Sequence, residues 1–160
     1  MTSAQTTSSS TSDCGRAPLI ATTLQFGLDI EYSNLCHSVA TESAKFLGPL
    51  DHNLVQSAYA AASVHVLASF GETPGLVNLE AAAQGCPIVV SDRGAERDYF
   101  GDGAIYCDPL DPSSIRAAVG RAIGEGRCQR VRSLQGEVAS RYTWQAVAKQ
   151  MKGVYQELMI

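Results

Sequence analysis

Short apolar runs of β type alternate with helical patterns along most of this 160-residue chain. Such alternation is typical of a parallel sheet with helices packed on its faces. The predicted strands are 19–24, 45–47, 64–68, 87–90 and 105–107. Only helical patterns follow the last of these strands. We therefore predict an α/β fold with a parallel sheet and flanking helices.

Three helices are predicted after the last strand. Asp111 and Pro112 are start signals for the first, and Thr143 is a start signal for the third. The third predicted helix carries a long apolar stripe, formed by Trp144, Val147, Ala148, Met151, Val154, Tyr155 and Leu158. The apolar face of the second is marked by Val131, Leu134 and Val138.

The segment 69–83 places two carboxylates, Glu72 and Glu80, eight positions apart around the start of one predicted helix. Thr73 is a suitable N-cap, Pro74 a suitable first helical residue, and Gly85 a suitable left-handed residue just past the end. On this interpretation the two glutamates lie roughly 10 Å apart at the helical rise per residue.

The predicted helix start has the features of a site for a particular kind of ligand. Free backbone amides at Gly75, Leu76 and Val77 would hold a phosphate, which the helix dipole favours. Glu72 and Glu80 would repel a bare anion but accept hydrogen bonds from hydroxyl groups. The spacing therefore suits a ligand that is anionic in the middle and polyhydroxylated at both ends, such as a sugar diphosphate.

The same residues resemble a known family. The two glutamates separated by seven residues in Glu-Thr-Pro-Gly-Leu-Val-Asn-Leu-Glu are similar to the donor-site signature of retaining glycosyltransferases of family 4 (group 1), which have the GT-B fold. The flanking segments follow in the family's order, over about residues 45–158: Phe46 to Leu50, Tyr59 to Ser63, Gly85 to Asp92, Tyr106 to Asp111 and Tyr142 to Trp144. The resemblance implies a Rossmann-like sheet and the incomplete C-terminal, donor-binding half of such an enzyme.

The resemblance also implies roles for individual residues. Glu72 would contact the donor sugar near the reacting carbon as the catalytic residue, and Glu80 would hold the ribose of the nucleotide. The amides of Gly75, Leu76 and Val77 would hold the pyrophosphate. Leu50 and Asp51 occupy the loop where relatives touch the base, although Asp51 fits a plain N-cap role equally well.

No metal and no cofactor besides the nucleotide-sugar substrate is expected. The sequence has no Asp-x-Asp, which fits GT-B enzymes that need no metal, and its five cysteines are too far apart for a zinc site. Retaining members are thought to pass the acceptor proton to the leaving phosphate, so the protein contributes positioning and charge stabilisation. His65 lies in an apolar strand and fits a core or edge histidine.

Length limits what the chain does alone. A two-domain GT-B enzyme needs roughly twice 160 residues. We predict a disordered Ser/Thr-rich leader over residues 1–17 and a nucleotide-sugar-binding GT-B C-terminal domain over 18–160. Relatives grip the diphosphate with an Arg and a Lys a few residues later, whereas Arg16 is followed by no Lys before Lys45.

Two function classes remain open at this point. The first is the donor-binding half of a retaining glycosyltransferase, inactive as an isolated chain and completed by an N-terminal GT-B domain or partner chain. The second is a non-catalytic remnant that binds nucleotide sugar weakly or serves as an interaction module. A sugar-nucleotide epimerase is disfavoured, because its further acid–base residues are not found.

Charge and hydropathy narrow the partners. A formal charge of -4 and a pI near 5.3 argue against nucleic-acid binding. Residues 111–160 carry 8 basic and 4 acidic side chains, which fits a solvated helix face or a peripheral membrane surface near a lipid-linked acceptor. The chain shows neither signal-peptide features nor a membrane-spanning apolar run. We therefore expect a cytoplasmic protein.

Overall fold

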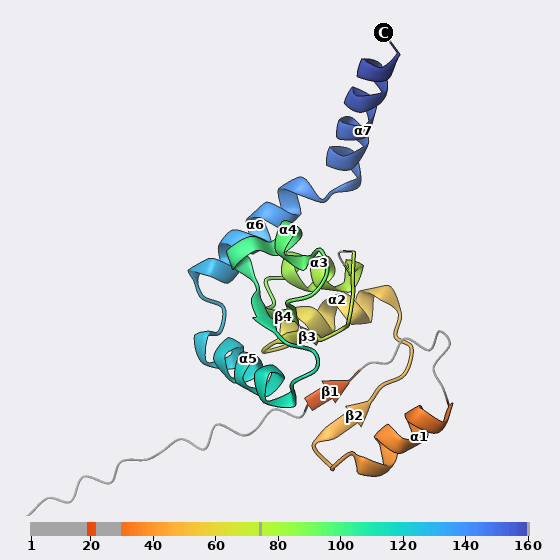
Figure 1. Cartoon of the computed structure of the whole chain (residues 1–160), viewed down its shortest axis with the longest axis vertical. Coiled ribbons are helices and arrows are strands. Elements are labelled where there is room, and N and C mark those ends of the chain that lie inside the picture. Colours follow the sequence, from red (N-terminus) through yellow and green to blue (C-terminus); the bar gives the residue numbers. More distant parts are fainter. Residues whose placement is uncertain (1–18, 22–29, 74, 160) are drawn as a thin grey trace, which may run out of the picture. The chain divides into compact units, whose positions relative to one another are not determined.

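The computed structural model describes residues 19–21, 30–73 and 75–159, and the chain divides after Leu50 into two compact units. The first unit contains β1 (Leu19–Ala21), α1 (Ile30–Val39) and β2 (Ala44–Phe46). β1 and β2 lie side by side (Figure 1). They pair in parallel, with Leu19 opposite Ala44. Residues 22–24 of the first predicted strand and the predicted leader over 1–17 lie outside the described residues.

The second unit is built on three parallel strands in the order β3, β4, β5. Their bounds are His65–Leu67, Ile88–Ser91 and Ile105–Cys107. Leu67 of β3 lies opposite Val90 of β4, which lies opposite Tyr106 of β5. The α/β prediction is confirmed, and the five predicted strands fall into two hydrogen-bonded groups, β1 with β2 and β3 with β4 and β5.

Helices connect and follow these strands. They are α2 (His52–Ala61), α3 (Leu76–Ala83), α4 (Glu96–Phe100), the 3-10 turn η1 (Gly101–Gly103), α5 (Pro112–Glu125), α6 (Gln129–Arg141) and α7 (Trp144–Leu158). Asp111 caps α5 by accepting from the Ser113 amide over 2.8 Å, and Thr143 Oγ1 caps α7 by accepting from the Ala146 amide over 3.1 Å. Both predicted starts are therefore confirmed. The sequence interpretation did not include α4 or η1.

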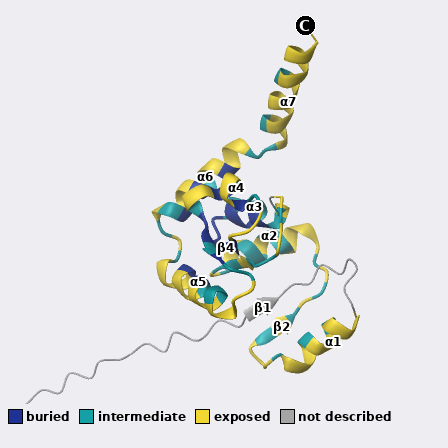
Figure 2. Ribbon diagram, in the orientation of Figure 1, coloured by how far each residue is buried: buried dark blue, intermediate teal, exposed yellow. Residues whose placement is uncertain are grey.

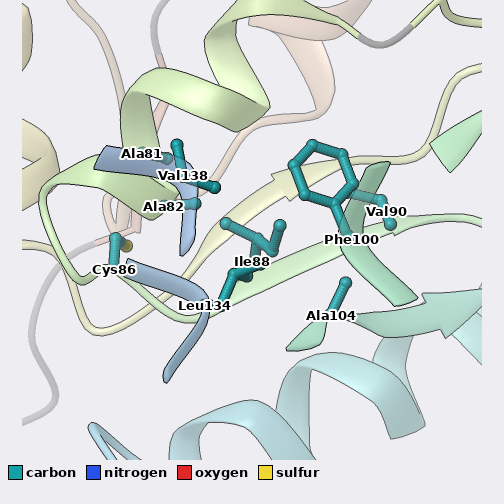
Figure 3. Packing of buried hydrophobic residues seen from close by; sticks show 9 residues of the cluster. All are labelled: Ala81, Ala82, Cys86, Ile88, Val90, Phe100, Ala104, Leu134 and Val138. Atoms are coloured by element: carbon teal, nitrogen blue, oxygen red, sulfur yellow. The ribbon is translucent and has the colours of Figure 1, made fainter. Parts of the chain in front are cut away.

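The core lies on both faces of β4, which is buried along its whole length (Figure 2). On one face the side chains come from β4, α3, α4, α6 and the connecting segments: Ala81, Ala82, Cys86, Ile88, Val90, Phe100, Ala104, Leu134 and Val138 (Figure 3). On the other face Val89 packs with Ile105 and Cys107 of β5 and with Ala118 and Ala122 of α5. The predicted apolar face of α6 is confirmed by the burial of Val131, Leu134 and Val138.

Arg127, between α5 and α6, ties two helix ends together. Its guanidinium donates to the Gly85 carbonyl oxygen over 2.5 Å, just beyond α3, and to the Ala60 carbonyl oxygen over 2.5 Å, at the end of α2. The last carbonyls of a helix lack intrahelical donors and carry partial negative charge, so a cation stabilises them. Arg127 thereby joins the C-terminal ends of α2 and α3.

Helix α7 has no buried residue. Its predicted apolar stripe is largely exposed, with 89% of the surface of Trp144 and 76% of that of Leu158 accessible to solvent. A helix of this amphipathic pattern is normally stabilised by packing its apolar face against another element. None of the helices in the described part of the chain is both long and apolar enough to cross a bilayer.

Candidate functional site

Glu72 lies in the loop between β3 and α3, beyond the carboxyl end of β3, and is half-buried. The loop that follows β4 supports it, because the Ala95 amide donates to the Glu72 carbonyl oxygen over 3.3 Å. Ligands of parallel α/β sheets bind beyond the carboxyl ends of the strands. Glu72 therefore lies at the end of the sheet where a ligand is expected.

Helix α3 begins two residues later than predicted. Its N-cap is Gly75, so Thr73 is not the N-cap, and Pro74 lies outside the described residues. Gly75 has a φ of 65°, a conformation that glycine adopts without strain. A Cβ atom at this position would lie 2.8 Å from Asn78 Nδ2 and 3.2 Å from Leu67 Cδ2. The turn is thus shaped by tertiary neighbours, which the capping pattern does not show.

The later start changes which amides are free. The Asn78 amide donates to the Gly75 carbonyl oxygen over 2.9 Å, which closes a tight first turn. The amides of Leu76 and Val77 precede that bond in the first turn of α3, where helix amides lack intrahelical partners. Two of the three predicted phosphate-binding amides thus belong to the first turn, and Gly75 caps it. The predicted left-handed Gly85 at the other end is confirmed, with a φ of 67°.

Glu80 lies on α3 and is half-buried. Its charge acts on Tyr59 of α2: burial raises the pKa of the Tyr59 hydroxyl, and the Glu80 carboxylate raises it further. Because Glu72 lies outside the helix, the predicted separation based on helical rise does not apply to the two glutamates. They instead flank the turn at Gly75, one before it and one after it.

A hydrogen bond between Asn78 and His65 joins the first turn of α3 to β3. Asn78 is fully buried, and its Oδ1 lies 3.0 Å from His65 Nε2. The half-buried His65 is thus a hydrogen-bonded histidine of the sheet, as its place in an apolar strand suggested. Sequence reasoning missed Asn78 and Tyr59. The available signal was an asparagine inside a helix, where its side chain is unfavourable unless it finds a partner.

Leu50 and Asp51 lie where the two units meet along the chain. Leu50 is half-buried in the first unit. Asp51 begins the second and caps α2, since its Oδ1 accepts from the amides of Asn53 and Leu54 over 3.0 and 3.1 Å. The N-cap role of Asp51 is therefore confirmed, while its predicted contact with a base stays a prediction. Arg16 lies outside the described residues.

One hollow of the second unit lies away from the two glutamates. It is a shallow cavity of about 380 Å³ between α4, η1 and α6, with Arg97, Asp102, Arg130 and Glu137 in its lining. Neither Glu72 nor Glu80 lines it. Leu76, at the start of α3, is exposed, so this end of the helix is accessible to solvent. Among the described residues, no three His, Cys, Asp or Glu side chains converge as metal ligands would.

Comparison with known proteins identifies the family. Residues 21–125 match the family described as glycosyl transferases group 1. Among curated relatives, the glycogen synthase of Mycobacterium tuberculosis is 34% identical over 117 residues. The D-inositol 3-phosphate glycosyltransferase of Corynebacterium urealyticum is 31% identical over 122 residues. The matches cover 71% and 74% of this chain but only 28% of each relative.

The solved structures agree with this result. Sucrose-phosphate synthase from Thermosynechococcus elongatus superposes with a TM-score of 0.71 and 26% identity, over 81% of this chain and 34% of that protein. The fold is that of a GT-B glycosyltransferase, of which this chain spans a part. The chain belongs to the glycosyl transferases of group 1.

Proposed function

We propose that this chain binds the nucleotide-sugar donor of a retaining glycosyltransferase and supplies the donor-binding half of that enzyme. The observation that carries the proposal is the turn at Gly75, which presents the start of α3 between Glu72 and Glu80. The pyrophosphate accepts hydrogen bonds from the amides of Gly75, Leu76 and Val77. Glu72 accepts from hydroxyls of the sugar and Glu80 from those of the ribose. Leu50 and Asp51 face the base.

In the proposed reaction this chain positions the donor sugar and stabilises the charge on the leaving diphosphate. The helix N-terminus offsets the charge that grows on the leaving diphosphate, so the proposal requires neither a metal nor a further cofactor. Glu72 orients the sugar so that the acceptor attacks from the face on which the diphosphate leaves, with the acceptor proton passing to the leaving phosphate oxygen. Retention of configuration follows from that geometry.

A second half must supply the acceptor. The chain spans 28% of the two curated relatives, and the apolar face of α7 is exposed in the described structure. We propose that an N-terminal GT-B domain or a partner chain covers this face and carries the acceptor site.

The free thiols of Cys86 and Cys107 fit the reducing environment of the cytoplasm, where we place the protein.

Titration with UDP-, GDP- and ADP-sugars, followed through backbone amide resonances, tests donor binding. We expect shifts at Leu76 and Val77, and binding weaker by ~1.5–3 kcal/mol in Glu80→Gln, the range for hydrogen bonds to a charged group. Glu137→Gln, an exposed carboxylate on α6, is the matched control and should bind as the wild type does. If millimolar nucleotide sugars leave the amide chemical shifts of Leu76 and Val77 unchanged, the donor-binding proposal is wrong.

The alternative is a non-catalytic remnant that binds nucleotide sugar weakly or acts as an interaction module. The chain spans only 28% of the two curated relatives, which fits either function. The isolated chain should show no transfer under either function. If the chain is the donor-binding half of an enzyme, adding the acceptor-binding half should restore transfer. Glu72→Gln should then lower kcat more than it raises KM. Donor binding that is never accompanied by transfer in the completed assembly would favour the remnant.

A further inference from the structure

Glu96, the first residue of α4, is a buried carboxyl group with a surface accessibility of 1%. Neither of its carboxyl oxygens has a hydrogen-bond partner in the structure. Among the described residues, Ser69 Oγ is the only other buried side-chain oxygen or nitrogen that lacks one. Both residues lie just beyond the carboxyl ends of β3 and β4. Burying a polar group without a hydrogen-bond partner costs free energy of folding. The presence of Glu96 at the carboxyl ends of the strands, where ligands bind, therefore requires an explanation.

Gly94 brings this carboxyl group close to Glu72. A Cβ atom on Gly94 would lie 2.7 Å from Glu96 Oε2 and 3.0 and 3.2 Å from the carbonyl oxygen and amide nitrogen of Glu72. The carboxyl oxygen and the Glu72 backbone therefore both lie close to the same point. Only glycine leaves that point open, and its φ of 101° also favours glycine. The Ala95 amide, which donates to the Glu72 carbonyl oxygen, holds the two segments together.

The surroundings of Glu96 favour its neutral form. Burial raises the pKa of the Glu96 carboxyl, its own backbone amide offsets part of this, and the charge of Glu72 adds to it. Burial raises the pKa of the Tyr106 hydroxyl on β5. The Arg97 guanidinium, 4.1 Å from the ring centroid, lowers it, and the charges of Asp102 and Glu96 raise it. A neutral carboxyl has one O–H donor, which the Glu72 carbonyl oxygen can accept beside the bond from Ala95.

We propose that Glu96 is a positioning residue for Glu72, with its carboxyl group hydrogen-bonded to the backbone of Glu72. In the neutral form Glu96 donates to the Glu72 carbonyl oxygen and fixes the loop that presents the Glu72 carboxylate. In the ionised form it loses this donor and adds a second negative charge beside Glu72. The assignment rests on the proposed role of Glu72 in contacting the donor sugar.

An NMR titration of the ligand-free chain between pH 4.5 and 8 tests the contact directly. We expect the side-chain carboxyl carbon of Glu96 to titrate above the ordinary value of about 4.3. The backbone amide of Glu72 should shift with the same midpoint. In Glu96→Gln that shift should be lost, whereas Asp98→Asn, an exposed acid two residues along the same helix, should retain it. A Glu72 amide that titrates identically in Glu96→Gln would overturn the proposal.

Glu96→Leu separates positioning from a merely structural role. The substitution replaces the buried carboxyl group with an apolar side chain of similar volume, so the fold should persist. The loop around Glu72 should become more mobile, with lower heteronuclear NOE values at residues 70–73. A loop as rigid as that of the wild type would contradict the positioning role.

These measurements use no ligand, so they separate this proposal from the proposed function. Coupling between Glu96 and Glu72 without any response to nucleotide sugars would support the positioning contact and refute donor binding. A response of Leu76 and Val77 to nucleotide sugars without coupling would refute the role of Glu96 and leave donor binding supported.

Discussion

His65 Nε2 lies 3.0 Å from Asn78 Oδ1, and this hydrogen bond joins β3 to the first turn of α3. Because the amide oxygen accepts, Nε2 is the protonated nitrogen of the neutral ring. The ring also meets Tyr59 edge-on, with centroids 5.3 Å apart. The imidazole is therefore a structural support beneath the candidate donor site.

This bond gives the chain a specific pH dependence. Burial lowers the pKa of His65, and the hydrogen bond to Asn78 opposes the shift only in part. The unfolded chain binds the proton more readily than the native one, so the stability from neutral His65 is complete above about pH 6.5. It is lost as the pH falls through the lower native pKa. Denaturant unfolding at pH 7.5 and 5.5 measures the loss.

Variants isolate the part due to His65 from other titrating groups such as Glu96. His65→Gln should lose less stability than the wild type between the two pH values. His52→Gln, at an exposed histidine on α2, should show the wild-type difference. Equal pH dependence in His65→Gln and the wild type would contradict the assignment.

Gly75→Ala should destabilise the chain by ~1–3 kcal/mol, the range for a residue held in an unfavourable backbone region. The new methyl group would also lie too close to Asn78 Nδ2. Gly120→Ala is the matched control, because a Cβ there meets no atom within 4 Å and Gly120 lies inside α5. That control should gain ~0.5–1 kcal/mol, as alanine is the better helix former. Equal effects of the two changes would argue against a tight turn at Gly75.

Arg127→Met should lower the free energy of unfolding by ~2–3 kcal/mol, since hydrogen bonds from a charged group at two helix ends are lost. Arg116→Met, at an exposed arginine on α5, should change it by less than ~0.5 kcal/mol. Urea unfolding of both variants compares them. A loss in Arg127→Met no larger than the control would show that water replaces the guanidinium at these carbonyls.

The exposed face of α7 should make the isolated chain associate. Clustered exposed apolar side chains mark a partner surface or drive self-association, and Met151, Tyr155 and Leu158 all lie on α7 with half or more of their surface accessible. Sedimentation velocity over a hundredfold concentration range should show larger species at high concentration. Replacing these three residues with Gln, Ser and Gln should leave a monomer. A wild-type chain that stays monomeric throughout would refute the prediction.

Local patterns predicted much of the second unit, because they report interactions between residues close in sequence. The caps at Asp111 and Thr143 and the buried face of α6 are of this kind. The start of α3 was predicted two residues early, since the turn at Gly75 depends on Leu67 and Asn78. Arg127 and Glu96 could not be identified as important, because their neighbours come from segments far along the chain.

Strand β4 has a consequence for how this unit opens. Val89 and Val90 are adjacent in sequence but belong to different apolar clusters, one with α5 and one with α3 and α6. Neither layer can separate without exposing one side of the same strand. Local fluctuations should therefore release α7 and the loops first, while β4 opens only when the whole unit does. Its amides should be the slowest to exchange with deuterated water, at a rate that follows global unfolding.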